Sequence, residues 1–313
     1  QEVADLNIIT HRIAELALNP GAIAQDGFLT THLIESLLTP ERELIAEYLG
    51  RPDDIIESPT AAQKMIYGDT RRRVPLVWDV DNPVMAGVVQ NQDSYMQSVA
   101  AQRPYFFDHI QGFTDQAFAE FYELTGRQYA RVSTYKADDA DYLIIGQGSM
   151  VSSAEVVADY LRETRGLKVG VVNMTMWRPF PGNLLGSILR GKKGVAVLER
   201  LDQPLAVDLP MIREIRATLA KCIENGASGG KNGDLPYADH AVYSKITDAP
   251  PLYSGSFGMG SRDLQPEGLI ATVENMLPEG KRKKLFYLSI DFVRDDPGTP
   301  KQRARQEDIL EAY

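Results

Sequence analysis

The second half of the chain alternates short apolar runs with amphipathic stretches. "DYLIIG" (141–146), "KVGVVNMTM" (168–176) and "GVAVLER" (194–200) are apolar runs bounded by polar residues, a pattern typical of buried strands. We expect two further strands, in "LYSGSFG" (252–258) and "KLFYLSIDF" (284–292). Because helical patterns fill the gaps between these runs, the sequence predicts an α/β domain with a mostly parallel sheet and helices on both faces.

Helical periodicity is clearest directly after the first of these strands. An apolar face recurs there at i, i+3, i+4 and i+7, and a serine before it can accept an unpaired N–H of the first turn. We therefore expect a helix with Ser152 or Ser153 as its N-cap. Its buried face would consist of Ala154, Val157, Ala158 and Leu161.

Three more helices are expected between the later strands. One lies in "RPFPGNLLGSILRG" (178–191), another over 205–221 with a break at Pro210 in its first part, and a third over 266–277. Pro266 suits the first turn of the third helix, where no backbone N–H is needed. The apolar face of the first of the three would be Leu184, Leu185, Ile188 and Leu189.

The first half of the chain has weaker patterning. Residues 1–38 carry a helical stripe, whereas 39–112 are rich in Pro, Asp and Arg and are typical of a connector with short helices, such as 60–67 and 92–101. A helix over 114–124 follows. The apolar residues expected to share a face are Ile9, Ile13, Leu16 and Leu18 in the first segment and Phe118, Phe121, Tyr122 and Leu124 in the last helix.

Composition narrows the class of protein. With 313 residues, 43% of them apolar and 24% charged, the chain fits an ordinary globular protein of two domains, or of one and a half. No apolar run approaches the ~18 residues that suggest a membrane span, so no membrane partner is expected. The net charge of -10 argues against a nucleic-acid partner, whose phosphates require a basic face. The basic run Arg71–Arg73 is interpreted as a solvated loop.

The single cysteine, Cys222, limits the cofactors that the chain could hold by itself. One thiol cannot form an internal disulfide, a cysteine zinc site or an iron–sulfur cluster, and we predict no metal site. The sequence lacks the basic start and apolar stretch of a signal peptide, so we expect a reducing, cytoplasmic environment. The chain begins with Gln1 rather than Met, and we interpret it as a piece of a longer protein.

The run Gly146-Gln147-Gly148 raises the question of a phosphate-binding turn after the first strand. A dinucleotide fingerprint needs a third glycine three residues later, where this chain has Val151. It also needs an acidic residue at the end of the second strand, which here ends in "NMT" (173–175). We therefore favour a strand-to-helix turn that uses glycine for its positive φ. The alternative is nucleotide binding through Gly148 and Ser149.

Arg178 is the other candidate for ligand binding. It follows the second strand, at the carboxyl edge where parallel sheets bind ligands. We favour a structural ion pair with Glu199 at the end of the third strand. The alternative is that Arg178 binds coenzyme A or a nucleotide together with Gly148 and Ser149. The Gly-rich stretch 224–234 lacks the spacing of a phosphate loop and is interpreted as a flexible connection.

Several stretches resemble the pyruvate:ferredoxin (flavodoxin) oxidoreductases, in that family's order and over most of the chain. In the first half the resemblance rests on "QDGFLTTH" (25–32), "VVQNQDSYMQSVAAQRPYF" (88–106) and "LTGRQY" (124–129). In the second half it rests on "IIGQGSMVSSAEVVADYL" (144–161), "VVNMTMWRPF" (171–180), "GVAVLERLDQPLA" (194–206) and "YSGSFGMGSRDLQPEGLIATVENM" (253–276). No single stretch is a strong motif, and the ordered set carries the resemblance.

The resemblance implies a division into three parts. Residues 1–38 would be the end of a thiamine pyrimidine-side domain, an incomplete α/β remnant, and 39–112 its connector. Residues 113–313 would be a domain like the C-terminal domain of transketolases. Enzymes of this family decarboxylate a 2-oxo acid on thiamine diphosphate with Mg²⁺, pass electrons through 4Fe-4S clusters to ferredoxin or flavodoxin, and transfer the acyl group to coenzyme A.

The resemblance also shows which parts of such an enzyme this chain lacks. The GDG…N thiamine signature, the cysteine clusters and the first part of the pyrimidine-side domain are absent from the sequence. We therefore expect the chain alone to bind none of these cofactors and to lack a complete active site. Its role would be structural, supporting the remaining domains or subunits of a homodimeric enzyme that reduces ferredoxin or flavodoxin.

Thr31 and His32, in the first matching stretch, are the candidate catalytic residues beside the cofactor pocket. The alternative for His32 is a buried, hydrogen-bonded histidine at a strand end. The chain departs from the family's pattern at Leu29, Leu33 and "QPLA" (203–206), which leaves open a 2-oxo acid other than pyruvate. Two competing hypotheses are a stand-alone nucleotide- or coenzyme A-binding module and an interaction protein without enzyme partners.

Overall fold

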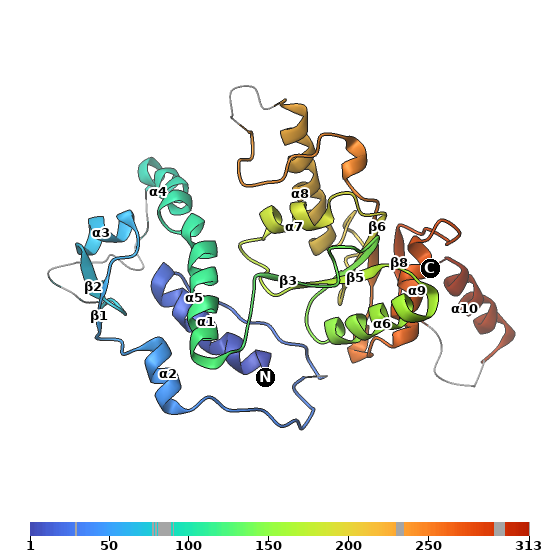
Figure 1. Cartoon of the computed structure of the whole chain (residues 1–313), viewed down its shortest axis with the longest axis horizontal. Helices are drawn as coiled ribbons and strands as arrows, with labels where there is room; N and C mark the ends of the chain where they lie inside the picture. The colour runs from blue at the N-terminus through green and yellow to red at the C-terminus, as the bar shows by residue number, and fades with distance from the viewer. Residues whose placement is uncertain are drawn as a thin grey trace. The chain divides into compact units, whose positions relative to one another are not determined.

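A computed structural model describes residues 1–28, 30–76, 78, 80, 89, 91–229, 235–290 and 298–312. The chain divides into two compact units, of which the first comprises 1–25 and 34–131 and the second comprises 26–33 and 132–313 (Figure 1). The segment 26–33 belongs to the second unit, although its neighbours on both sides belong to the first. The division after residues 38 and 112 that the family resemblance implies stays a prediction.

The first unit is mainly helical. Beside its helices lies a short two-stranded antiparallel sheet, in which Ile55 pairs with Arg72. The predicted short helices near 60–67 and 92–101 are both present (Figure 1). The elements are α1 (Glu2–Ala17), α2 (Arg42–Leu49), β1 (Ile55–Glu57), α3 (Ala61–Tyr67), β2 (Thr70–Arg72), α4 (Gln92–Tyr105), the 3₁₀ turn η1 (Phe107–His109) and α5 (Ile110–Thr125).

The core of the first unit forms where α1 and α2 pack against α5. Ile9, Phe118 and Phe121 are buried together, and the hydroxyl of Tyr48 donates a hydrogen bond to the carbonyl of Ala117 (2.8 Å). Burying these large side chains supplies the main stabilisation, at about 1.5–3 kcal/mol for each. The predicted stripe on the first helix is confirmed at Ile9 and at Leu16, which are 1% and 6% exposed.

The face predicted for α5 was only half right. Tyr122 and Leu124 are 51% and 37% exposed. The helix begins at Ile110. Residues that are three or four positions apart lie on the same face of a helix, and this spacing defines the buried face of α5. The buried residues on that face are Phe113, Thr114, Ala117, Phe118 and Phe121.

The predicted solvated loop at Arg71–Arg73 was wrong. Arg71 lies in β2 and is 4% exposed. Its guanidinium donates to the side-chain oxygen of Gln63 (2.7 Å) and to the carbonyl of Glu15 (2.8 Å). Two further N–H donations go to the carbonyls of Arg72 and Arg73. The basic run was mistaken for surface because no local pattern shows that Arg71 meets Gln63 and Glu15, 8 and 56 residues away.

The second unit contains a six-stranded sheet in the order β3-β5-β4-β6-β7-β8. Strands β4 to β8 are parallel, and β3 runs antiparallel to β5 at the edge. The predicted mostly parallel sheet is confirmed, with every predicted strand present. The strands are β3 (Val132–Tyr135), β4 (Tyr142–Gly146), β5 (Val169–Met174), β6 (Gly194–Glu199), β7 (Leu252–Ser256) and β8 (Leu285–Tyr287).

Two of these strands differ from the prediction. Edge strand β3 was missed, because only its first residue is buried and its four residues give no continuous apolar run. Strand β8 is shorter than the predicted 284–292, of which 291 and 292 lie outside the described residues.

Helices cover both faces of the sheet, as predicted. Helices α6 and α9 pack over one face, and α7 and α8 pack over the other (Figure 1). The alternation along β4 shows why: Ile144 faces the first layer, whereas Leu143 and Ile145 face the second. The helices are α6 (Met150–Arg165), α7 (Gly182–Leu189), α8 (Pro210–Ala227), α9 (Pro266–Met276) and α10 (Pro300–Ala312), with 3₁₀ turns η3 (Ile246–Asp248) and η4 (Met259–Ser261).

Two predicted helix starts need correction. Helix α6 begins at Met150 with Ser149 as its N-cap, so Ser152 and Ser153 lie inside the helix. Helix α8 begins at Pro210 rather than being broken by it, because proline fits the first helical position. The buried face predicted for α6 is confirmed, as Ala154, Val157, Ala158 and Leu161 are all buried.

The predicted flexible connection at 224–234 was wrong in its first part. Helix α8 continues to Ala227, and Asn225 is 1% exposed. Gly226 lies so close to the backbone of Tyr243 that a β-carbon would come within 1.7 Å of that residue's carbonyl oxygen. Residues 230–234 lie outside the described residues.

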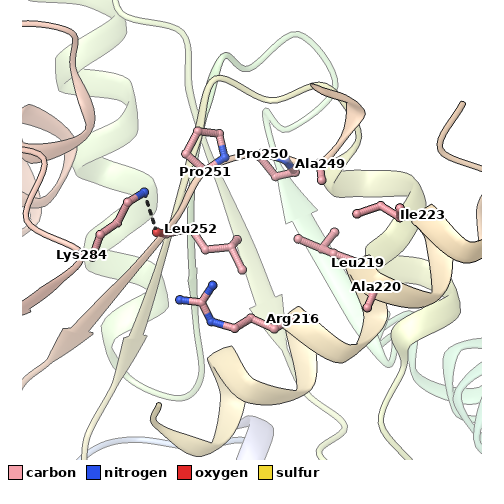
Figure 2. A pocket seen from close by; sticks show the side chains of 9 residues that line it. All are labelled: Arg216, Leu219, Ala220, Ile223, Ala249, Pro250, Pro251, Leu252 and Lys284. Atoms are coloured by element: carbon pink, nitrogen blue, oxygen red, sulfur yellow. Dashed lines mark hydrogen bonds between the residues drawn. The ribbon is translucent and has the colours of Figure 1, made fainter. Parts of the chain in front are cut away.

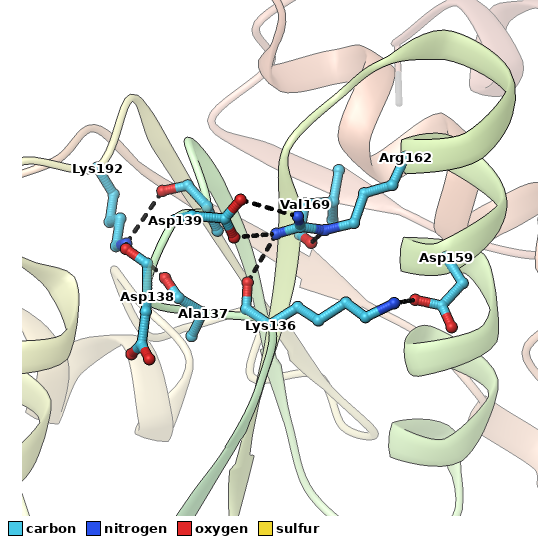
Figure 3. A network of polar contacts seen from close by, with 9 residues as sticks. Lys136, Ala137, Asp138, Asp139, Asp159, Arg162, Val169 and Lys192 are labelled. Atoms are coloured by element: carbon cyan, nitrogen blue, oxygen red, sulfur yellow. Dashed lines mark hydrogen bonds and ion pairs between the residues drawn. The ribbon is translucent and has the colours of Figure 1, made fainter.

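Two cations hold the loop 136–141 at the amino edge of the sheet (Figure 3). Arg162 of α6 binds both carboxylate oxygens of Asp139 (2.8 and 3.1 Å) and donates to the carbonyls of Lys136 and Val169 (2.7 Å each). Lys192 donates to the backbone carbonyls of Ala137, Asp138 and Ala140 (2.6, 3.3 and 3.0 Å). Arg162 and Lys192 therefore fix the connection between β3 and β4.

Candidate functional site

The turn between β4 and α6 lies at the carboxyl edge of the sheet. Gly148 adopts a φ of 70°, a left-handed conformation that glycine reaches without steric cost. The side-chain amide of Gln147 donates to the carbonyl of Met174 at the end of β5 (3.0 Å). These contacts explain the glycine in this turn by backbone geometry alone.

A carboxylate from the chain itself occupies the start of α6. Asp26 Oδ2 accepts a hydrogen bond from the backbone N–H of Ser149 (3.0 Å) and another from the Ser149 hydroxyl. Arg200 Nε lies 3.6 Å from Asp26 Oδ1. Unpaired N–H groups and the helix dipole make this position attractive for an anion. Asp26 fills the place that a ligand phosphate would need, so the observed geometry does not fit a bound phosphate.

The candidate residues Thr31 and His32 lie in a compact turn of the same segment. The Thr31 hydroxyl oxygen accepts from the backbone N–H of Phe28 (3.0 Å) and lies 2.9 Å from His32 Nδ1. The His32 ring stacks on Phe28 with ring centroids 4.3 Å apart. Both candidates are exposed, so the alternative interpretation of His32 as a buried histidine at a strand end was wrong. Leu29 lies outside the described residues.

Arg178 does not pair with Glu199, contrary to our prediction. Its guanidinium binds Glu214 of α8 (2.7 Å) and lies over the ring of Trp177, 4.6 Å from its centroid. Both members of the ion pair are substantially exposed, at 54% and 36% of their side chains. The structure brings Gly148 and Ser149 together, but the described contacts of Arg178 do not include either of them.

Other polar groups at the carboxyl edge also have internal partners. Glu199 accepts hydrogen bonds from the backbone N–H groups of Met211 (2.6 Å) and Ile212 (3.2 Å) at the start of α8. Burial raises the pKa of Glu199, and the two backbone donors oppose that rise. Ser256, the last residue of β7, donates to the carbonyl of Leu201 (2.8 Å). The polar groups at the carboxyl edge of the sheet are therefore hydrogen-bonded largely to other groups of the same chain.

A groove at the other end of the sheet contains none of the predicted site residues (Figure 2). Its floor is apolar, and its two cations already have partners. Arg216 pairs with Asp208 (2.8 Å), and Lys284 donates to the carbonyl of Leu252 (3.2 Å) beside the ring of Tyr253. The apolar lining consists of Leu219, Ala220, Ile223, Ala249, Pro250, Pro251 and Leu252.

The chain's own residues do not fit an iron–sulfur cluster. Its one cysteine, Cys222, is fully buried, and burial raises the pKa of its thiol, which opposes the thiolate form that binds metal. In the part of the chain that the structure describes, no three His, Cys, Asp or Glu side chains gather as metal ligands would.

Among the described residues, none of the helices combines the length and the hydrophobicity that a membrane span requires.

Sequence reasoning missed two residues of this site, Asp26 and Arg200. Asp26 stands in "QDGFLTTH", the stretch that drew attention to Thr31 and His32, and Arg200 directly follows a predicted strand. The position after a parallel strand was a usable signal for Arg200. No local pattern connects Asp26 to Ser149, which is 123 residues away.

Comparison with known proteins gives a consistent result. Residues 140–240 match the family model described as pyruvate:ferredoxin oxidoreductase core domain II. The chain is 29% identical over 304 residues to a probable pyruvate-flavodoxin oxidoreductase of Escherichia coli. It is 27% identical over 279 residues to pyruvate synthase subunit PorA of Thermotoga maritima, and 26% identical over 285 residues to a pyruvate:ferredoxin oxidoreductase of Moorella thermoacetica.

These alignments cover most of this chain but only part of each relative. They include 92%, 88% and 91% of this chain, respectively. They include 24%, 59% and 21% of the three relatives. The chain thus corresponds to a segment of larger proteins.

Proposed function

Because this chain is related over most of its length to pyruvate:ferredoxin and pyruvate-flavodoxin oxidoreductases, we propose that it is a segment of a 2-oxo acid:ferredoxin or flavodoxin oxidoreductase. The substrate of the parent enzyme is pyruvate or a similar 2-oxo acid. The parent decarboxylates it on thiamine diphosphate with Mg²⁺, passes electrons through iron–sulfur clusters and transfers the acyl group to coenzyme A, in the cytoplasm. The other domains or subunits hold these cofactors.

One observation carries this proposal. The Escherichia coli relative aligns with 92% of this chain, yet the aligned part is only 24% of that relative. A segment of this size leaves ample protein outside it for the cofactor sites that the chain lacks. The family's match to residues 140–240 falls on the sheet of the second unit.

The geometry supports a structural role for the segment itself. At the carboxyl edge of the sheet, Asp26 accepts a hydrogen bond from the backbone N–H at the start of α6, and Glu199 accepts one from the start of α8. Because these donors already have acceptors within the chain, the edge suits a domain that supports its neighbours rather than one that binds a nucleotide. The stand-alone coenzyme A-binding module finds no comparable support.

Exposed apolar side chains on the second unit support contact with other parts of the enzyme, including a second copy in a dimer. Leu205 and Val207, in the loop after β6, are 102% and 100% exposed, and Val156 on α6 is 70% exposed. Large apolar side chains in solvent are typical of surfaces that another protein covers where they form a contiguous patch. The loop that holds the first two departs from the family's pattern, so it also bears on specificity.

The decisive experiment purifies the tagged chain from its native cells under anaerobic conditions. We expect a larger complex whose other parts carry GDG…N and cysteine clusters, and which reduces ferredoxin only when pyruvate and coenzyme A are both present. Complexes carrying Leu205→Glu and Val207→Glu should assemble less, whereas Lys301→Glu on the exposed face of α10 serves as control. A purified chain without such partners would contradict the proposal.

Calorimetry of the isolated chain tests the alternative. We expect no heat on titration with coenzyme A or with thiamine diphosphate and Mg²⁺. Saturable binding of coenzyme A that Gly148→Val or Arg178→Ala abolishes would instead establish a binding module. The Arg178→Ala change alone should leave the free energy of unfolding within about 1 kcal/mol, because its ion pair is exposed.

A further inference from the structure

We propose that Asp26 is the positioning residue of the segment Asp26–Leu33: its carboxylate docks the segment on the second unit and so fixes where Thr31 and His32 are presented. The docking is a property of this chain alone. Its consequence for the reaction rests on the proposed function, in which Thr31 and His32 lie beside the cofactor pocket. The comparisons assign no role to Asp26.

The path of the chain shows that this segment must be held. Gln25 and Ile34 belong to the first unit, whereas the eight residues between them, 26–33, belong to the second. Ordering these residues costs conformational entropy that specific contacts must offset. Among the described residues, the hydrogen bonds between the segment and the rest of the second unit are those from Ser149 to Asp26.

The chemistry of the contact selects a carboxylate. Two donors of Ser149 converge on Asp26 Oδ2, and the Arg200 guanidinium faces Oδ1 at 3.6 Å. The side chains of Asp26 and Arg200 are only 18% and 21% exposed, so water screens the charges incompletely. Hydrogen bonds to an ionised acceptor at a helix start are stronger than neutral ones. An asparagine keeps the shape and one acceptor oxygen but loses the charge that strengthens the two hydrogen bonds from Ser149 and forms the ion pair with Arg200.

The contact at Asp26 reaches the candidate residues through a compact turn. The carbonyl of Phe28 accepts from the backbone N–H of His32 (3.0 Å), and the Thr31 hydroxyl oxygen accepts from the N–H of Phe28 (3.0 Å). With the His32 ring stacked on Phe28, the turn moves as one piece. Loss of the anchor at Asp26 therefore releases Thr31 and His32 together.

Hydrogen exchange of the 313-residue chain, followed by mass spectrometry, tests the docking directly. We expect Asp26→Asn to speed exchange of amides 28–33 about tenfold while the strands of the sheet keep their protection. Asp26→Glu should restore part of the protection. Asp138→Asn is the matched control, because it removes the same charge from an exposed loop of the same unit.

Two further variants separate positioning from a general loss of stability. Ser149→Ala and Arg200→Gln leave Asp26 intact but remove its partners, and each should speed exchange of the same segment. Unchanged exchange of 28–33 in Asp26→Asn would overturn the proposal. A uniform rise in exchange over the whole second unit in all three variants would overturn it as well.

The purified complex tests the consequence for the reaction. There Asp26→Asn should lower kcat for pyruvate oxidation about tenfold or more and leave the KM for ferredoxin unchanged, with partial recovery in Asp26→Glu. An inactive wild-type complex combined with faster exchange in Asp26→Asn would contradict the proposed function and leave the docking established. An active complex unaffected by Asp26→Asn would refute the link to Thr31 and His32.

Discussion

Glu199, the last residue of β6, accepts a hydrogen bond from the backbone N–H of Met211 in the first turn of α8, with the two atoms 2.6 Å apart. The carboxylate therefore caps the helix that follows its own strand. The sequence suggested Arg178 as its partner, since both residues were expected at the carboxyl edge. The start of α8 has unpaired N–H groups and lies closer, which decides the pairing.

Removing the Glu199 cap should destabilise the second unit. Glu199→Ala leaves two N–H groups of α8 without an acceptor, and we expect a loss of about 2–3 kcal/mol in the free energy of unfolding. Glu199→Gln keeps one acceptor oxygen and should cost about half of that. Urea denaturation measures both, with Glu163→Ala on the exposed face of α6 as control. Equal stability of Glu199→Ala and wild type would refute the cap.

The pH dependence of the same residue has a defined sign. Because burial raises the pKa of Glu199 above its unfolded value, its contribution to stability is present at low pH and is lost as the pH rises through the folded pKa. Glu199→Gln does not titrate. The stability of this variant relative to wild type should therefore improve as the pH rises above the unfolded pKa of a glutamate, as measured by urea unfolding at each pH.

Asp5 in the first unit should show the opposite sign. Burial alone would raise its pKa, but hydrogen bonds from Arg127, Tyr129 and Gln1 outweigh burial and lower the pKa. The resulting stabilisation is present above the unfolded pKa and is lost as the pH falls through the folded one. Asp5→Asn should cost about 2–4 kcal/mol at neutral pH and flatten the loss of stability on acidification. Asp53→Asn, at an exposed position, should leave the acid transition unchanged.

Two glycines inside helices should respond in opposite directions to the same change. A β-carbon on Gly112 of α5 meets nothing within 4 Å, so Gly112→Ala should stabilise by about 0.5–1 kcal/mol. At Gly226 the β-carbon would lie 1.7 Å from the carbonyl oxygen of Tyr243, and Gly226→Ala should destabilise by more than about 2 kcal/mol. Hydrogen exchange of α5 and α8 reports each change in its own unit. Tolerance of alanine at Gly226 would show that α8 and Tyr243 do not approach so closely.

Arg71 should not tolerate even lysine. The guanidinium donates to Gln63, to Glu15 and to two neighbouring carbonyls, and a single ammonium cannot reach all of them. We expect Arg71→Lys to lower the stability of the first unit by about 2–4 kcal/mol in urea denaturation. Arg51→Lys, at an exposed position in the same unit, should change it by no more than about 0.5 kcal/mol.

The sequence by itself determined the α/β architecture of the second unit. The strands at 142–146, 169–174 and 194–199 and the helix faces between them follow from apolar runs and periodicity, which are local properties. The proline at position 266 marked the start of its helix for an equally local reason, since it lacks the N–H that the first turn does not use.

Only the tertiary structure decided which polar groups pair. Asp26 accepts a hydrogen bond from Ser149, which is 123 residues away. Arg71 donates to the carbonyl of Glu15, which is 56 residues away. Glu199 caps α8 instead of binding Arg178, and β3 joins the sheet edge without a continuous apolar run. Hydrophobic periodicity specifies which face of an element is buried, but not which distant donor meets a given acceptor. That pairing depends on how the chain brings its elements together.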